Sequence, residues 1–116
     1  MQVLVAIESG LYRQVIGEAI RGLRPHVEVC VTDLDTLEDE VGRMKHGLVF
    51  ASRPYSYRVP NKRTAWVEYL PYEHPPARIC LGGRRWELET VGLDELLSIV
   101  DETEELLRTG RELGNC

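Results

Sequence analysis

The sequence has no apolar run near the roughly 18 residues that a membrane-spanning helix needs. It also lacks the basic and then apolar opening of a secretory signal peptide, and it contains no internal repeat or low-complexity tract. Its length of 116 residues suits one core of about 100 to 150 residues. These features predict a single domain over residues 1–116, without membrane contact and with a cytoplasmic location.

Cysteine and histidine are scarce, with three residues of each. None of Cys30, Cys80 and Cys116 lies in a C-x-x-C pair or at the ligand spacing of a zinc site. Cys30 and Cys80 fall within predicted strands, where we expect both to be buried as small hydrophobic residues. Each histidine adjoins a proline or glycine, and none is paired with a nucleophile. The sequence therefore predicts no metal, no cofactor and no hydrolytic triad.

Basic residues are outnumbered, because 14 lysines and arginines face 19 acids and leave a net charge of −5. This balance works against attraction to nucleic acid or to anionic membranes. The charge is nevertheless unevenly distributed. Residues 33–40 hold five acids, whereas residues 53–63 hold four bases and no acid. We therefore do not expect nucleic-acid binding by the chain.

What the chain does contain is a βαβαβ pattern in its first half. Apolar runs at residues 3–7, 27–31 and 48–51 predict strands. Residues 11–23 have the spacing of a helix with one buried face, and a shorter helical pattern follows Asp35. The expected buried face consists of Leu11, Tyr12, Val15, Ile16, Ala19, Ile20 and Leu23. Short connections between such elements require right-handed crossovers, which predicts parallel strands in the order 2-1-3.

The second half of the chain has a different pattern. Residues 65–70 predict a fourth strand, and residues 77–81 and 85–89 flank a Gly82-Gly83 pair that permits a tight antiparallel hairpin. Leucines spaced along residues 93–108 predict a final helix across the sheet. The predicted fold class is therefore α/β. It combines a three-layer βαβαβ opening with extra strands, a closing antiparallel hairpin and a C-terminal helix.

The chain opens with Val3-Leu4-Val5-Ala6-Ile7-Glu8-Ser9-Gly10-Leu11-Tyr12-Arg13. This segment resembles the start of a response-regulator receiver domain of flavodoxin-like fold, in which an apolar strand leads into a magnesium-binding acidic pair. Ile7 and Glu8 take the positions of that pair, and Ser52 takes the position of the phosphorylated aspartate. The resemblance covers about the first 54 residues. Because Ile7 cannot ligate a metal and Ser52 cannot form an acyl phosphate, it implies a regulatory module without phosphotransfer.

A first candidate site lies where the first and third strands end. Parallel neighbours end at the same edge of a sheet, and ligands bind at that edge in open α/β folds. Backbone N–H groups at a helix start, together with arginines, could hold a small anion or a nucleotide there. The candidate ligand-binding residues are Glu8, Ser9, Gly10, Arg13, Ser52 and Arg53. The alternative is that Ser9 only caps the helix and that the arginines are solvated.

A second candidate site is the segment of residues 53–63, which interleaves basic and aromatic side chains as binding segments do. Its candidate partner-binding residues are Tyr55, Tyr57, Arg58, Lys62 and Arg63. Self-association could use the edge of the last hairpin, or the acidic final helix against this basic segment of a neighbour. The sequence thus predicts a non-catalytic regulatory or protein-interaction module with a protein partner or a second copy. The alternative is a protein that binds a small anion or a nucleotide, with or without catalysis.

Overall fold

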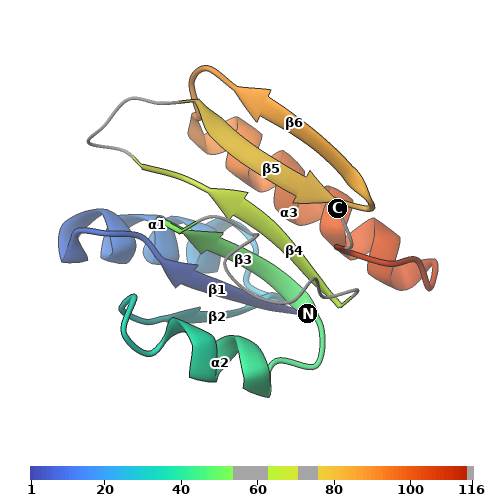
Figure 1. The fold of residues 1–116 in the computed structure, drawn as a ribbon, viewed down its shortest axis with the longest axis horizontal. Helices are drawn as coiled ribbons and strands as arrows, with labels where there is room; N and C mark the ends of the chain where they lie inside the picture. Colours follow the sequence, from blue (N-terminus) through green and yellow to red (C-terminus); the bar gives the residue numbers. More distant parts are fainter. Residues whose placement is uncertain (54–62, 71–75, 115–116) are drawn as a thin grey trace.

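The computed structural model describes residues 1–53, 63–70 and 76–114, in which six strands form one mixed sheet with the order β2-β1-β3-β4-β5-β6 (Figure 1). The strands are β1 (Gln2–Ala6), β2 (Glu28–Val31), β3 (Gly47–Ala51), β4 (Thr64–Glu68), β5 (Ala77–Leu81) and β6 (Arg84–Leu88). The helices are α1 (Gly10–Leu23), α2 (Leu37–Arg43) and α3 (Leu93–Arg108).

The pairing confirms the predicted order 2-1-3, since β1 lies parallel to both β2 and β3. The predicted closing hairpin is confirmed as well, because β5 and β6 pair antiparallel around Gly82 and Gly83. The sequence left the direction of the fourth strand open. In the structure β4 runs parallel to β3, with Ala51 opposite Glu68, and antiparallel to β5.

The core consists of two apolar clusters, because successive side chains of a strand point to opposite faces of the sheet. On one face, side chains such as Val5 and Phe50 pack with buried residues of α1 and α3. On the other face, side chains such as Val49 and Trp66 pack with Leu37 of α2. The residues of β3 are buried throughout, as expected for a central strand covered on both faces.

Helix α1 buries less of its apolar side than the sequence predicts. Of the seven expected core residues only Ile16 and Ile20 are buried. The exposed fractions of four others are 71% for Leu11, 57% for Val15, 48% for Leu23 and 38% for Tyr12. Helix α1 packs over β1 and β2, and a Cβ at Gly17 would lie only 2.7 Å from Val31 Cγ2. The sheet therefore covers one side of the helix, while the apolar arc continues around it beyond the sheet.

Cys30 is exposed, which corrects the expectation that it is buried. Its strand β2 lies at the edge of the sheet, and the side chains of this strand alternate between exposed and half-buried. Partial burial is nevertheless the main cause that raises the pKa of the Cys30 thiol, and the charge of Glu40 adds to it. Cys80 lies in the inner strand β5 and is buried as expected.

A polar clasp, formed by Arg24, His26, Asp101 and Glu104, joins the end of α1 to α3. Arg24 donates from Nε and Nη2 to the two carboxylate oxygens of Asp101 at 2.7 and 2.8 Å. His26 Nε2 lies 2.9 Å from Glu104 Oε1. The hydrogen bond to Arg24 lowers the pKa of the Asp101 carboxyl. The clasp thereby links the first helix to the last, on the sheet face that both cover.

Candidate functional site

The carboxyl ends of β1, β3 and β4 lie side by side at one edge of the sheet, which we call the strand-end edge. Ala6, Ala51 and Glu68 are register partners across these three strands. Glu8 and Ser52, which follow β1 and β3, therefore lie together as the sequence predicts. Their contact is direct, because the Glu8 N–H donates to Ser52 Oγ at 2.8 Å.

The hydroxyl of Ser52 also joins β3 to the end of β4. It donates its proton to the backbone oxygen of Tyr69 at 2.9 Å, while the Tyr69 N–H donates to the oxygen of Ala51 at 2.9 Å. Ser52 is 9% exposed. Because a hydroxyl has one proton to donate, this side chain is committed to holding three strand ends together.

Ser9 begins α1 in an unusual backbone conformation. Its φ of 93° and ψ of 116° make it the one non-glycine residue with positive φ in the described part of the chain. The Ser9 side chain makes no capping hydrogen bond to the helix, in contrast to the capping role considered from the sequence. Such backbone strain costs on the order of 1–3 kcal/mol and is concentrated at functional sites.

Replacing Ser9 by glycine is expected to raise the free energy of unfolding by about 1 kcal/mol, because glycine adopts positive φ without a Cβ penalty. Urea denaturation followed by circular dichroism measures the change. The matched control is Gly83→Ser, which places a side chain at a φ of +80° where no atom lies within 4 Å of the added Cβ. This control should lose stability. A clear loss for Ser9→Gly would mean that contacts of the Ser9 side chain outweigh the strain.

Charges of both signs meet at the strand-end edge. The guanidinium of Arg13 lies beside Gly10, since a Cβ at Gly10 would be 3.4 Å from Arg13 Nη2. Hydrogen bonds from the backbone and side chain of Thr36 hold the pKa of Asp33 below its usual range, and the charge of Arg13 contributes. Asp33 was not among the predicted site residues. Asp33 follows β2, which the predicted order 2-1-3 places beside β1. Because parallel neighbours end at the same edge, this order could have located Asp33 here.

Two aromatic residues beside this edge were also missed by the sequence analysis. Burial is the main cause that raises the pKa of the Tyr69 hydroxyl, and Tyr12 of α1 adds to the effect. Trp66 of β4 donates its Nε1–H to the backbone oxygen of Arg53 at 2.7 Å. The backbone of Arg53 is therefore held against β4. The positions of Tyr69 and Trp66 at this edge depend on β4 being the neighbour of β3, which the sequence did not settle.

Of the five residues predicted to bind a partner, Arg63 lies within the described part of the chain. It is exposed and lies at the opposite edge of the sheet, where its oxygen accepts the N–H of Gly47 at 3.0 Å. Arg63 lies there because it immediately precedes β4, which runs parallel to β3. The other predicted partner-binding residues, Tyr55, Tyr57, Arg58 and Lys62, lie outside the described residues.

Carboxylates and a guanidinium lie together at the strand-end edge. Glu8 is exposed, and Asp33 lies close enough to Arg13 for the arginine charge to lower its pKa. An incoming anion would therefore meet carboxylates as well as a guanidinium. The side chain of Ile7 is fully buried in the core. Within residues 1–53, 63–70 and 76–114, no group of three or more His, Cys, Asp or Glu side chains could hold a metal ion.

No family model, curated protein or solved structure matches the chain. Among the described residues, no helix is both long enough and apolar enough to cross a membrane. Function is therefore inferred from the geometry of the strand-end edge and from the chemistry of the surface.

Proposed function

We propose that this chain is a non-catalytic, regulatory protein-interaction module of receiver-like βαβαβ build, and that it binds a second copy of itself through α1. The main support is the distribution of exposed apolar side chains. Among the described residues, four of the five large exposed hydrophobic side chains belong to α1. Contiguous apolar surface of this kind is typical of interaction sites.

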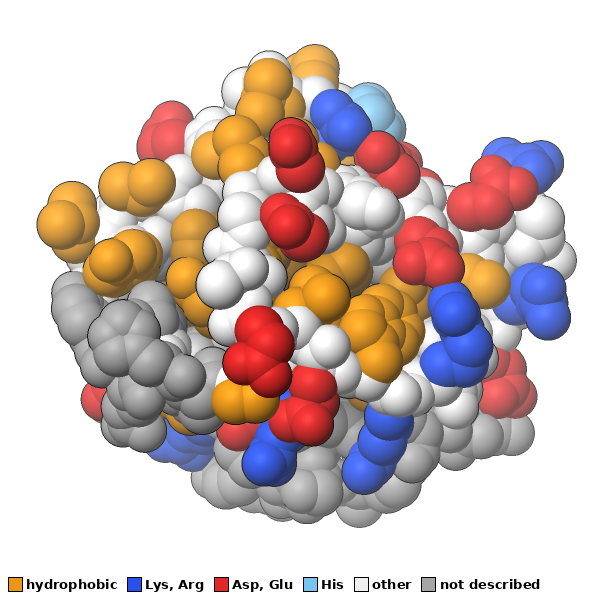
Figure 2. All heavy atoms as spheres, turned by 90° about the horizontal axis from the view of Figure 1, so that it is seen from above, with side chains coloured by type: hydrophobic (Ala, Val, Ile, Leu, Met, Phe, Trp, Pro, Cys, Tyr) orange, Lys and Arg blue, Asp and Glu red, His pale blue; other side chains and the backbone are white. Residues whose placement is uncertain are grey.

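Three of these four side chains, those of Leu11, Val15 and Leu23, form a ridge along α1 together with the partly buried Ala19. Leu11, Val15, Ala19 and Leu23 are spaced four residues apart, so they lie in one row on the helix surface. Figure 2 views the molecule from above, and hydrophobic side chains gather at its left and top, whereas charged side chains dominate its right. Leu11, Val15, Ala19 and Leu23 are all uncharged, so the ridge itself favours contact with another apolar surface.

The ridge is complementary to itself, which favours a second copy as its partner. If two α1 helices pack antiparallel about a two-fold axis, Leu11 lies against Leu23 of the second copy. Val15 then lies against the smaller Ala19, so a larger side chain faces a smaller one at the centre of the contact. Glu18 beside the ridge is already paired with Arg21 at 3.2 Å, and the contact buries no unpaired charge there. An isologous interface requires this self-matching.

The strand-end edge supports the non-catalytic part of the proposal. The position of the phosphorylated aspartate in the receiver-like pattern is occupied by Ser52, whose proton is donated to Tyr69. Binding of a small anion or a nucleotide, the alternative from the sequence, has less support because Glu8 and Asp33 contribute negative charge near Arg13. The exposed ridge of α1 has no role in that alternative.

Val15→Glu is expected to weaken self-association at least about tenfold, because an unpaired carboxylate in an apolar contact costs more than about 1.4 kcal/mol. Sedimentation equilibrium over a range of protein concentrations measures the dimer dissociation constant. The matched control is Gln14→Glu, which adds the same charge to the adjacent exposed position of α1. It should dimerise like the wild-type chain.

Two results would contradict this proposal. A wild-type chain that remains monomeric at about 0.5 mM would exclude self-association of functional strength, since this concentration corresponds to a binding free energy of only about 4.5 kcal/mol. Equal dimerisation of Val15→Glu and Gln14→Glu would exclude the α1 ridge as the interface. Circular dichroism of both variants establishes that they are folded.

A further inference from the structure

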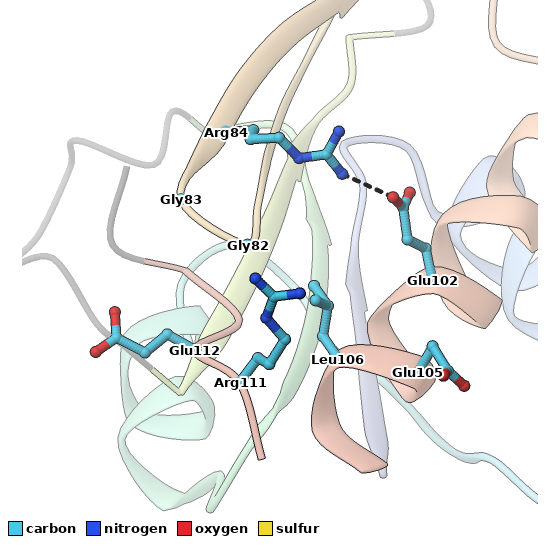
Figure 3. A pocket seen from close by; sticks show the side chains of 8 residues that line it. All are labelled: Gly82, Gly83, Arg84, Glu102, Glu105, Leu106, Arg111 and Glu112. Carbon is cyan, nitrogen blue, oxygen red and sulfur yellow. Dashed lines mark hydrogen bonds and ion pairs between the residues drawn. The ribbon is translucent and has the colours of Figure 1, made fainter. Parts of the chain in front are cut away.

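A cavity of about 560 Å³ lies between the turn that joins β5 to β6 and the segment that follows α3 (Figure 3). Its lining residues are Gly82, Gly83, Arg84, Glu102, Glu105, Leu106, Arg111 and Glu112. None of them belongs to the α1 ridge or to the strand-end edge. The cavity is therefore a separate feature of the molecule.

The backbone fixes the two sides of this cavity. Gly82 and Gly83 have φ values of 62° and 80°, which glycine adopts readily and which make the turn tight. The Gly82 N–H donates to the oxygen of Leu113 at 2.7 Å, and the Arg111 N–H donates to the oxygen of Leu106 at 2.9 Å. The turn and the segment after α3 are thus connected through main-chain hydrogen bonds, and the cavity between them is pre-formed.

The charged side chains of the cavity are not equivalent. Figure 3 shows that Arg84 and Arg111 extend into the space from opposite sides, whereas Glu105 and Glu112 point away from it. Arg84 donates to Glu102 at 2.7 Å. Arg111 is exposed and makes no ion pair or side-chain hydrogen bond with any residue in the described part of the chain. Its guanidinium is therefore available to a ligand.

The apolar part of the cavity comes from Leu106. A Cβ at Gly82 would lie 3.0 Å from Leu106 Cδ1, so the leucine side chain packs directly beneath the glycine turn. A ligand held by Arg111 would therefore contact a hydrophobic surface as well as a guanidinium. Since Glu105 and Glu112 point away, the charged side chains that face the cavity are Arg84, Glu102 and Arg111, and Arg84 is paired with Glu102. A singly charged carboxylate matches the one remaining guanidinium, that of Arg111, whereas the second charge of a phosphate would lie near the Glu102 carboxylate without a partner of its own.

We propose that this cavity binds a small monocarboxylate that carries an apolar group. Arg111 binds the carboxylate, because the guanidinium fork matches its two oxygens. Leu106 contacts the apolar group, and Arg84 bounds the opposite side of the cavity while it remains paired with Glu102. Two sources share this chemistry: a free carboxylic acid and the C-terminal residue of a peptide.

Titrating 4-methylpentanoate into the ¹⁵N-labelled chain tests the proposal by nuclear magnetic resonance. We expect saturable shifts of the Gly82, Gly83 and Arg111 amide signals, and binding at least about tenfold weaker for the uncharged 4-methylpentanamide. Arg111→Gln should weaken binding of the acid to a similar extent. The matched control Arg43→Gln removes an exposed, ion-paired arginine of α2 and should leave binding unchanged.

The titration can also overturn the proposal. No saturable shift at about 20 mM acid, equal binding of acid and amide, or unchanged binding in Arg111→Gln would each do so. Tighter binding of inorganic phosphate would exclude a monocarboxylate as the preferred class. An N-acetylated peptide ending in leucine identifies the source of the ligand. If the peptide binds more tightly than the free acid and its binding is lost when its C-terminus is amidated, the ligand is a chain terminus. If the peptide binds more weakly than the free acid, the ligand is a free acid.

Discussion

Replacing Gly47 by alanine is expected to lower the free energy of unfolding by about 3 kcal/mol or more. A Cβ at this position would lie 2.1 Å from the backbone oxygen of Gln2 and 2.6 Å from Met44 Cε. The methionine side chain can move, but the oxygen of Gln2 belongs to β1, which pairs with β3 at this register. Relief of the clash therefore requires two central strands to separate.

Gly42→Ala is the matched control for this substitution. Gly42 lies within α2, and no atom lies within 4 Å of an added Cβ. Alanine should stabilise the chain there by up to about 1 kcal/mol, because it has the higher helix propensity. Urea denaturation followed by far-ultraviolet circular dichroism measures both variants. A Gly47→Ala variant within 1 kcal/mol of wild type would show that β1 and β3 separate more easily than their packing indicates.

Replacing Ser52 by alanine should lower the free energy of unfolding by about 2–4 kcal/mol. The substitution leaves the Glu8 N–H without its acceptor at 2.8 Å and the Tyr69 oxygen without its donor at 2.9 Å. Each unsatisfied, partly buried group costs about 1–3 kcal/mol. Hydrogen exchange of the Glu8 amide should also become faster, because this N–H loses its partner.

Ser98→Ala provides the comparison, because Ser98 is an exposed residue within α3. Its effect should stay within about 0.5 kcal/mol of the wild-type stability. Equal stability of the two alanine variants would mean that the Ser52 hydroxyl does not hold the strand ends together. An unchanged exchange rate of the Glu8 amide would lead to the same conclusion.

The sequence predicted the parts of the fold that depend on local pattern. Apolar runs and helical spacing located β1, β2 and β3, and short connections between them required the order 2-1-3. Gly82 and Gly83 located the hairpin because their positive φ values suit a tight turn. The same reasoning predicted that Glu8 and Ser52 lie together, since parallel neighbours end at the same edge.

Features that depend on neighbours distant in the sequence were not predicted. Helical spacing identifies the apolar arc of α1. Tertiary packing decides how much of that arc the sheet covers, and Val15 and Leu23 remain exposed. The role of Ser52 required Tyr69, which reaches it only because β4 runs parallel to β3. The same direction of β4 moved Arg63 to the far edge of the sheet. Cys30 is exposed because it shares the sheet face of Leu4, and the cluster that α2 forms with Leu4 does not extend to the edge strand β2.

The clasp between Arg24 and Asp101 joins residues that are 77 positions apart. Leu96, Ile99 and Val100 of the same helix shield the sheet face that β3 and β4 share with the first strand. A fragment ending after β3 would therefore expose this face to water and lose the anchor of its own first helix. The βαβαβ opening is consequently one half of a mutually dependent structure, and an insertion that displaced the last helix would disturb the first.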